Sequence, residues 1–198
     1  MEGSCILELL STFHSVEDLA IWQHSPANSE VPENMGHLSL RRLSINVDRL
    51  PDVTIVNYFP TFKNLSHLEI IVEGPTWDGY ETLRDFPNLT HVCFNSTRLK
   101  SEVVLDLLER CSLLRVLIVD MNMAPVDLKS VNIPPDELRF LVFRDQMPVD
   151  LEDSIQEWKR STNGQIGLWE LADIIVEARH GQFSFVKCIS FETVTRNR

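Results

Sequence analysis

A motif of three apolar residues, Leu-x-x-Leu-x-Leu or a close variant, recurs along most of this chain. Its first position falls at intervals of 24 or 25 residues, on Val16, Leu40, Leu65, Leu89, Leu114 and Leu138. The fourth and sixth positions are apolar in every copy: Leu19 and Ile21, Leu43 and Ile45, Leu68 and Ile70, Val92 and Phe94, Leu117 and Val119, Leu141 and Phe143. A fixed period of this length is typical of stacked structural units, because one such unit cannot bury its apolar side alone.

Each copy predicts one short β-strand with a single buried face, since the fourth and sixth positions alternate with the residue between them. The connecting segments differ from copy to copy. Residues 101–111 have helical spacing with Ser101 as the expected N-cap, and residues 4–13 have similar spacing. Residues 77–86 predict a shorter turn of helix, whereas residues 25–36 predict a loop. The expected fold class is α/β: a curved parallel sheet backed by short helices and loops.

The period lapses after residue 144, which predicts two parts with one continuous core. Residues 1–148 form about six repeats of 24 to 25 residues, and residues 149–198 form a C-terminal cap. Within the cap, residues 149–161 and 168–179 have helical spacing, and residues 183–192 predict a final strand whose apolar triplet is Val186, Ile189 and Phe191. Because the last layer of a stacked core would otherwise face water, we expect this cap to cover the open end of the sheet.

Composition places the chain among ordinary globular domains and narrows the classes of partner. Its 198 residues are 43% hydrophobic and 24% charged, and the formal net charge is -11. A negative charge of this size argues against nucleic acid and favours a partner with a basic surface. The apolar runs are too short for a bilayer, and the first residues lack the features of a secretory signal. We therefore expect an intracellular protein, cytoplasmic or nuclear, with no membrane contact.

Several phrases of the sequence resemble leucine-rich-repeat proteins, and more narrowly the divergent repeat domains of fungal F-box proteins. They are "FKNLSHLEI", "FPNLTHVCF", "LLERCSLLRVLIV" and "WKRSTNGQIGLWELADIIVEAR". The resemblance covers nearly the whole chain and implies a leucine-rich-repeat solenoid. It also implies a protein-protein interaction module related to the substrate-recognition part of an F-box-type ubiquitin ligase receptor.

Two features depart from that resemblance. Leucine-rich repeats usually place Asn at the ninth position, but here only Asn122 does so among His24, Asp48, Glu73, Thr97, Asn122 and Gln146. The turns should therefore be irregular. The F-box itself is not visible ahead of Val16. The resemblance then implies a substrate-side module, a paralogue without the ligase attachment, or a fragment of a longer F-box protein.

The third, fifth and seventh positions of each strand point away from the predicted core, onto a concave face. They are Asp18, Ala20 and Trp22; Arg42, Ser44 and Asn46; His67, Glu69 and Ile71; His91, Cys93 and Asn95; Val116, Ile118 and Asp120; Phe140, Val142 and Arg144. Aromatic, arginine and polar side chains on such a face are typical of a protein-binding surface. The expected partner-binding residues are Trp22, Arg42, His67, Glu69, His91, Asn95, Phe140 and Arg144.

An alternative hypothesis is a metal-dependent enzyme or a metal-binding protein. Neighbouring strands lie about 4.8 Å apart, so His67 and His91 should be adjacent, with Glu69 and Cys93 beside them. Imidazole, carboxylate and thiolate groups are all metal ligands. No phosphate loop, nucleophile elbow or dinucleotide fingerprint is present in the sequence. We expect no cofactor and no catalytic residues, and keep these four side chains as the metal-ligand candidates.

The predicted concave face also contains an apolar patch formed by Val116, Ile118, Phe140 and Val142. An exposed patch of this kind is a liability in water. Either the C-terminal segment folds back over it, bringing Trp158 or Trp169 with it, or a partner covers it.

Overall fold

The computed structural model describes residue 12 and residues 15–22, 38–46, 62–72, 79–96, 99–120, 133–134, 136–143, 155–156, 158–160 and 163–181. The expected helix at residues 4–13, apart from residue 12, lies outside these residues. So do the expected loop at 25–36 and the expected final strand at 183–192.

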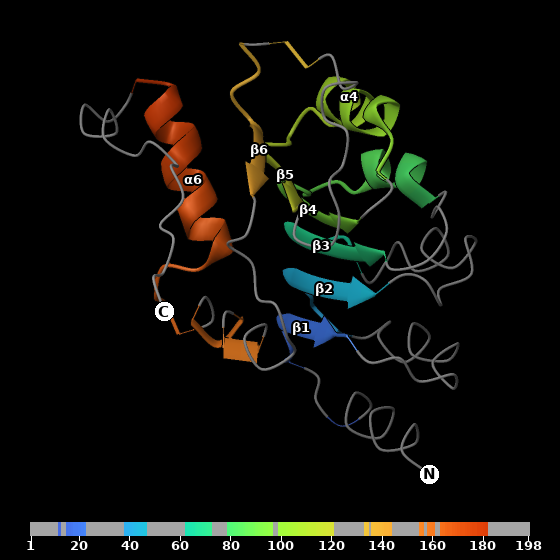
Figure 1. Cartoon of the computed structure of the whole chain (residues 1–198). Helices are drawn as coiled ribbons and strands as arrows, with labels where there is room; N and C mark the ends of the chain where they lie inside the picture. The colour runs from blue at the N-terminus through green and yellow to red at the C-terminus, as the bar shows by residue number, and fades with distance from the viewer. Residues whose placement is uncertain are drawn as a thin grey trace.

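Six parallel strands form one sheet in which the spatial order equals the order in the sequence (Figure 1). They are β1 (Asp18–Ile21), β2 (Arg42–Asn46), β3 (His67–Val72), β4 (His91–Ser96), β5 (Val116–Asp120) and β6 (Phe140–Phe143). The repeat predicted one strand for each copy, and all six are present. The α/β class and the parallel sheet are thereby confirmed.

The register of the first five strands follows the sequence period. Arg42 pairs with His67, His67 pairs with His91, and His91 pairs with Val116. A pairing that keeps equivalent positions side by side also keeps their side chains on the same face, because side chains alternate along a strand.

The main core lies on one face of the sheet and contains the predicted triplets of the second to fifth copies. Its members from these copies are Leu40, Leu43, Ile45, Leu65, Leu68, Ile70, Leu89, Val92, Phe94, Leu114, Leu117 and Val119, and Val16, Leu19 and Ile21 pack at its edge. Phe94, at the centre, is fully buried and meets Tyr80 edge-on, with ring centroids 5.4 Å apart.

Two short helices cover this core. The 3-10 helix η2 (Gly79–Asp85) contributes Leu83, and α4 (Ser101–Arg110) contributes Val104, Leu107 and Leu108. Both helices were predicted from their spacing, η2 within residues 77–86 and α4 within 101–111. The predicted cap is wrong: Ser101 is already the first helical residue, and Lys100 occupies the cap position without a side-chain hydrogen bond.

A third helix, α6 (Leu168–Arg179), has the predicted bounds and covers the opposite face of the sheet (Figure 1). It forms a second apolar cluster made of Cys93, Val116, Ile118, Leu141 and Phe143 from the strands and Leu168, Trp169, Ala172, Ile175 and Val176 from α6. Arg179 ties the end of α6 to β6 by donating to the carbonyl of Phe140 at 2.7 Å. We expected this helix to close the open end of the sheet and to share one continuous core with it. Instead, α6 lies on one face of the sheet, and its apolar cluster is separate from the main core.

This arrangement also decides the question of the apolar patch for its β5 part, since Val116 and Ile118 are fully buried beneath α6. The cover is intramolecular. Trp169 is the tryptophan that packs there, and it is 5% exposed.

The face assignment of β6 is wrong by one residue. Phe140 pairs with Leu117 where the repeat predicted Val116, so every side chain of β6 lies on the opposite face from the one expected. Phe140 packs against the main core, and Leu141 and Phe143 belong to the cluster under α6. The strand reads Phe-Leu-Val-Phe, apolar at each position, so alternation gives no information about which face is which.

Candidate functional site

The predicted pair of histidines is the centre of the most unusual part of the sheet. The imidazole rings of His67 and His91 are stacked, with centroids 4.1 Å apart and planes 8° from parallel. They belong to the first residues of β3 and β4, which are partners in the register. The prediction that these two side chains are neighbours is confirmed.

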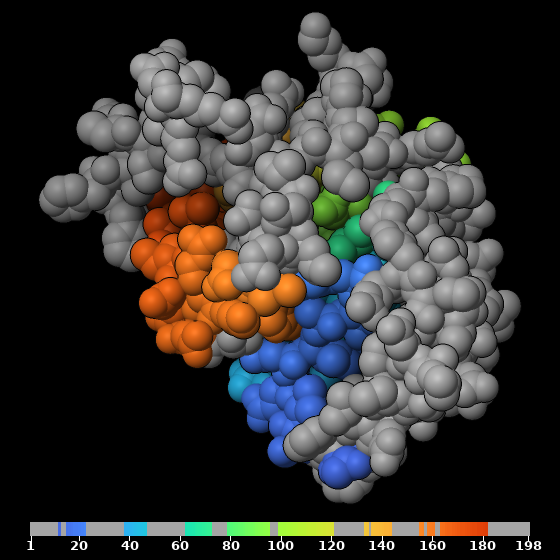
Figure 2. Space-filling view, turned by 60° about the horizontal axis from the view of Figure 1, so that its bottom comes forward, coloured from blue at the N-terminus to red at the C-terminus, as the bar shows by residue number. Residues whose placement is uncertain are grey.

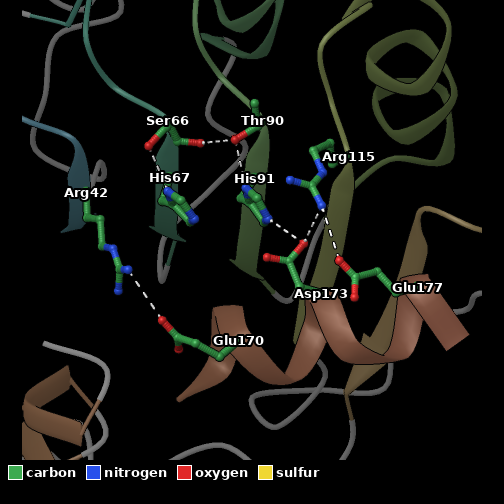
Figure 3. Close-up of polar contacts among 9 residues, drawn as sticks. All are labelled: Arg42, Ser66, His67, Thr90, His91, Arg115, Glu170, Asp173 and Glu177. Carbon is green, nitrogen blue, oxygen red and sulfur yellow. Dashed lines mark hydrogen bonds and ion pairs between the residues drawn. The ribbon is translucent and has the colours of Figure 1, made fainter. Parts of the chain in front are cut away.

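A hydroxyl group next to each histidine holds its ring. Nδ1 of His67 is hydrogen-bonded to Oγ of Ser66 at 2.8 Å, and Nδ1 of His91 to Oγ1 of Thr90 at 2.7 Å. The same hydroxyls donate across the strands, Ser66 to the carbonyl of Arg41 and Thr90 to the carbonyl of Ser66, both at 3.1 Å. The repeated hydroxyl-His dipeptide therefore ties ring position to strand pairing (Figure 3).

Helix α6 covers both rings. The indole of Trp169 meets His67 and His91 edge-on, with centroid distances of 5.3 and 5.9 Å. Oδ1 of Asp173 lies 3.1 Å from Nε2 of His91. The imidazole of His91 thus has a polar partner on each nitrogen, one from its own strand region and one from α6.

Acidic residues along one side of α6 contact side chains of β2 and β4 and of the residue just before β5 (Figure 3). Glu170 pairs with Arg42 at 3.3 Å, and Asp173 and Glu177 pair with Arg115 at 3.4 and 3.7 Å. The spacing of three and four residues places these carboxylates on the same side of the helix. These ion pairs are therefore consistent with the rotation of α6 on the sheet that its buried apolar side requires.

Burial makes the two histidines hard to protonate. The pKa of His67 is lowered to about 3, first because burial disfavours the charged ring and then because His91, Arg42, Arg41 and Arg115 add positive charge nearby. The pKa of His91 is also lowered, mainly by burial. Its hydrogen bond to Asp173 and the charge of that carboxylate act in the opposite direction.

A chain of hydrogen bonds crosses the first three strands on the same face. Nε1 of Trp22 donates to Oγ of Ser44 at 2.6 Å, and that hydroxyl donates to Oε2 of Glu69 at 2.6 Å. Trp22 also meets Trp158 edge-on, with centroids 6.2 Å apart. Figure 2 shows the segment around β1, in blue, beside the orange segment that contains the described residues between 155 and 167.

The contacts of His91 form a series of hydroxyl, imidazole and carboxylate, from Thr90 through His91 to Asp173. Such a series can activate a hydroxyl nucleophile when the hydroxyl meets the substrate. Here His91 is 3% exposed and the Thr90 hydroxyl already donates to a backbone carbonyl. In this structure the series is therefore a buried hydrogen-bond network.

The metal-ligand candidates do not converge on one point. Cys93 is fully buried in the cluster under α6, and burial raises the pKa of its thiol well above the usual value. Glu69 accepts a hydrogen bond from Ser44. The two ring nitrogens of His91 are already engaged, Nδ1 with Thr90 and Nε2 with Asp173. Within the described ranges, no group of three or more His, Cys, Asp or Glu side chains is placed to hold a metal ion.

The remaining predicted residues are distributed unevenly. Trp22, Arg42, His67 and Glu69 lie half-buried on the face that α6 partly covers. Asn95 lies at the carboxyl end of β4, and its Oδ1 atom is buried without a hydrogen-bond partner. Phe140 packs against the main core, so its assignment to the concave face is wrong. Arg144 lies outside the described residues.

Sequence reasoning missed the contribution of α6 to this site. Glu170, Asp173 and Glu177 follow a spacing of three and four residues in the sequence, which marks one acidic side of the helix. That signal was available, but it pointed equally well to a solvated face. Arg115, at the second position of its repeat, carried no signal of its own.

No protein family, curated protein or solved structure matches the chain. None of the helices in the described ranges combines the length and apolar content needed to cross a membrane.

Proposed function

We propose that this chain is a non-enzymatic protein-binding module, a leucine-rich-repeat solenoid whose partner contacts the sheet face over β1, β2 and β3. One observation carries the proposal: this part of the face retains half-buried Trp22, Arg42 and Glu69, whereas the apolar cluster beneath α6 lies over β4 to β6. Over β2 and β3, α6 contributes contacts from Glu170 and Trp169. Tryptophan and arginine are the residue types most enriched among binding hot spots.

The repeat and the sheet support the solenoid part of the proposal. Successive copies are 24 or 25 residues apart, each supplies one strand, and the strands follow each other in order. The connecting helices η2 and α4 both pack on the main core side. Repeats that contact only their neighbours and return on one side are the general plan of solenoid proteins.

Resemblance and charge suggest the kind of partner. The resemblance to fungal F-box proteins favours a substrate of a ubiquitin ligase, bound either by a receptor of that type or by a paralogue without the F-box. The net charge of -11 favours a basic surface on that partner. Near the proposed surface, Asp18 and Glu170 flank Arg42, and Glu69 lies one strand away.

Two observations weaken the support for the metal-dependent alternative. The strands are in sequential order, so the sheet has no point where strand order reverses, and that is where open α/β sheets usually bind ligands. The imidazole of His91 is also buried between Thr90 and Asp173. A binding module fits this geometry better than an enzyme does.

The proposal is tested by affinity capture with the full-length chain and two variants of the surface, Trp22→Ala and Arg42→Ala. We expect the affinity of each variant for specific partners to fall by roughly tenfold or more, which is the scale of a binding hot spot. Arg110→Ala is the matched control, because Arg110 is exposed on α4, behind the main core, where it pairs with Asp106.

Thermal unfolding of each variant separates lost contacts from lost folding. Retention of every partner by both Trp22→Ala and Arg42→Ala would contradict the proposal. An equal loss with Arg110→Ala would also contradict it, because the effect would then not depend on this face.

A further inference from the structure

The surface between α6 and the sheet contains carboxylates, which lose their negative charge when protonated, and imidazoles, which gain a positive charge. The charged and titratable side chains around the histidine pair, among the described residues, are Arg41 and Arg42 before and in β2, Glu69 in β3, Cys93 in β4, Arg115 before β5, and Glu170, Asp173 and Glu177 in α6. Two arginines are bound by the acidic side of α6, and the stacked imidazoles lie between them (Figure 3).

His91 can accept a proton with little change in its contacts. As an imidazolium it donates from Nδ1 to Thr90 and from Nε2 to Asp173, and Thr90 still donates to the carbonyl of Ser66. As a neutral ring it keeps the Asp173 contact only when the Thr90 hydroxyl turns to donate to Nδ1. The carboxylate of Asp173 thus offsets part of the effect of burial on this ring, whose pKa is still lowered.

His67 has no such compensation from α6. Its ring is hydrogen-bonded to Ser66, and α6 places the indole of Trp169 against it. A charge on His67 would lie 4.1 Å from the His91 ring and near Arg42, which repels it. The seated helix therefore opposes protonation of His67.

We propose that α6 is a pH-sensitive latch: it is held on the sheet while His67 is uncharged, and acidification loosens it while the main core remains folded. The separation of the two apolar clusters permits this, because among the described residues the buried side chains of α6 belong to the cluster that contains Cys93, Val116 and Ile118, and none belongs to the main core. Lifting α6 removes Trp169 from the histidines and returns water to them.

The sign follows from linkage. A histidine whose pKa is about 3 beneath α6 and near 6.5 when exposed to water binds more protons in the open state at every pH between these values. The packing of α6 on the sheet is therefore most stable above pH 6.5. It weakens as the pH falls through that window, by roughly tenfold in the opening equilibrium for each pH unit.

Amide hydrogen exchange of the full chain tests the proposal, with α6 compared to α4 in the same molecules. Protection factors corrected for intrinsic rates are measured at pH 7.5, 6.5, 5.5 and 5.0, above the range in which exposed carboxylates titrate. We expect protection of α6 to fall by roughly tenfold or more between pH 6.5 and 5.0, while that of α4 stays constant.

Three variants make the test specific. The side chains introduced by His67→Gln and His67→Phe cannot be protonated, and the second keeps an aromatic ring in the stack. Both should therefore reduce the response of α6 to the part that His91 contributes. His180→Gln is the matched control, because His180 follows α6 directly but is exposed. It should retain the wild-type response.

The proposal is overturned by any of three results. One is constant protection of α6 from pH 7.5 to 5.0. Another is a simultaneous loss in α4 and α6, which would indicate global unfolding. The third is a failure of the variants to differ as expected, with either a wild-type response in His67→Phe or an abolished response in His180→Gln.

Discussion

At the residue scale, Ser44 is the point where the first three strands exchange polar contacts on the α6 side. Its side chain is completely buried, and its hydroxyl accepts from Trp22 and donates to Glu69. A buried hydroxyl that serves two partners is costly to remove, because each partner loses a hydrogen bond away from water. The orientation of Trp22 on the proposed binding surface therefore depends on a serine one strand away.

We predict that Ser44→Ala lowers the free energy of unfolding by about 1–2 kcal/mol. Urea unfolding followed by tryptophan fluorescence measures the change. Ser112→Ala is the matched control, since Ser112 is exposed in the turn after α4, and should change stability by less than about 0.5 kcal/mol. Equal effects of the two substitutions would show that the hydrogen-bond chain through Ser44 contributes nothing.

Histidines 67 and 91 show what one strand position can and cannot reveal. Their adjacency follows from the period, because equivalent residues of neighbouring copies pair in a parallel sheet. Their protonation does not follow from it. The pKa of His67 is set first by burial beneath Trp169, then by His91 and by arginines in or just before β2 and β5.

At the element scale, α6 combines two ways of holding a helix on a sheet. Trp169, Ala172 and Ile175 bury apolar surface in the second cluster, while the acidic side pairs with arginines. Glu170 has a double role, because its Oε2 also accepts from the backbone N–H of Gly167 at 3.1 Å. It thereby satisfies a backbone donor at the start of the helix, and its negative charge interacts favourably with the positive end of the helix dipole.

Glu170→Ala should therefore lower the free energy of unfolding by about 1 kcal/mol, from the lost end contact and the partly exposed pair with Arg42. The first turn of α6 should exchange its amide hydrogens faster as well. Glu102→Ala, in the first turn of α4, is the control and should cost less than about 0.5 kcal/mol. The interpretation fails if both substitutions cost the same.

At the scale of the whole molecule, the main core runs without interruption across the first five strands. Leu65 and Leu114 occupy the same position two copies apart and are 0% and 2% exposed. Because one cluster contains both, loss of packing in one copy should be felt in all of them. The chain should unfold this core as one cooperative unit rather than copy by copy.

Leu65→Ala and Leu114→Ala should each cost about 2–5 kcal/mol, the usual range for a buried leucine. Leu113→Ala is a control adjacent to Leu114, with 53% of its residue surface exposed, and should cost less than about 0.5 kcal/mol. Urea unfolding at pH 7.5 measures these costs, and the amides of β3 and β5 should lose their protection from hydrogen exchange in one coincident transition as urea increases. Two separate transitions would refute a single cooperative core.

The sequence by itself determined the strands, their order and the main core of the first five strands, because a fixed period with one apolar triplet per copy favours parallel pairing of like strands with one shared apolar face. The tertiary structure decided which face β6 presents and what lies over the second face. An all-apolar strand fits either face equally well, so its register depends on the neighbour it meets. The position of α6 depends on contacts such as Asp173 with His91, 82 residues apart, and no local pattern specifies such a pairing.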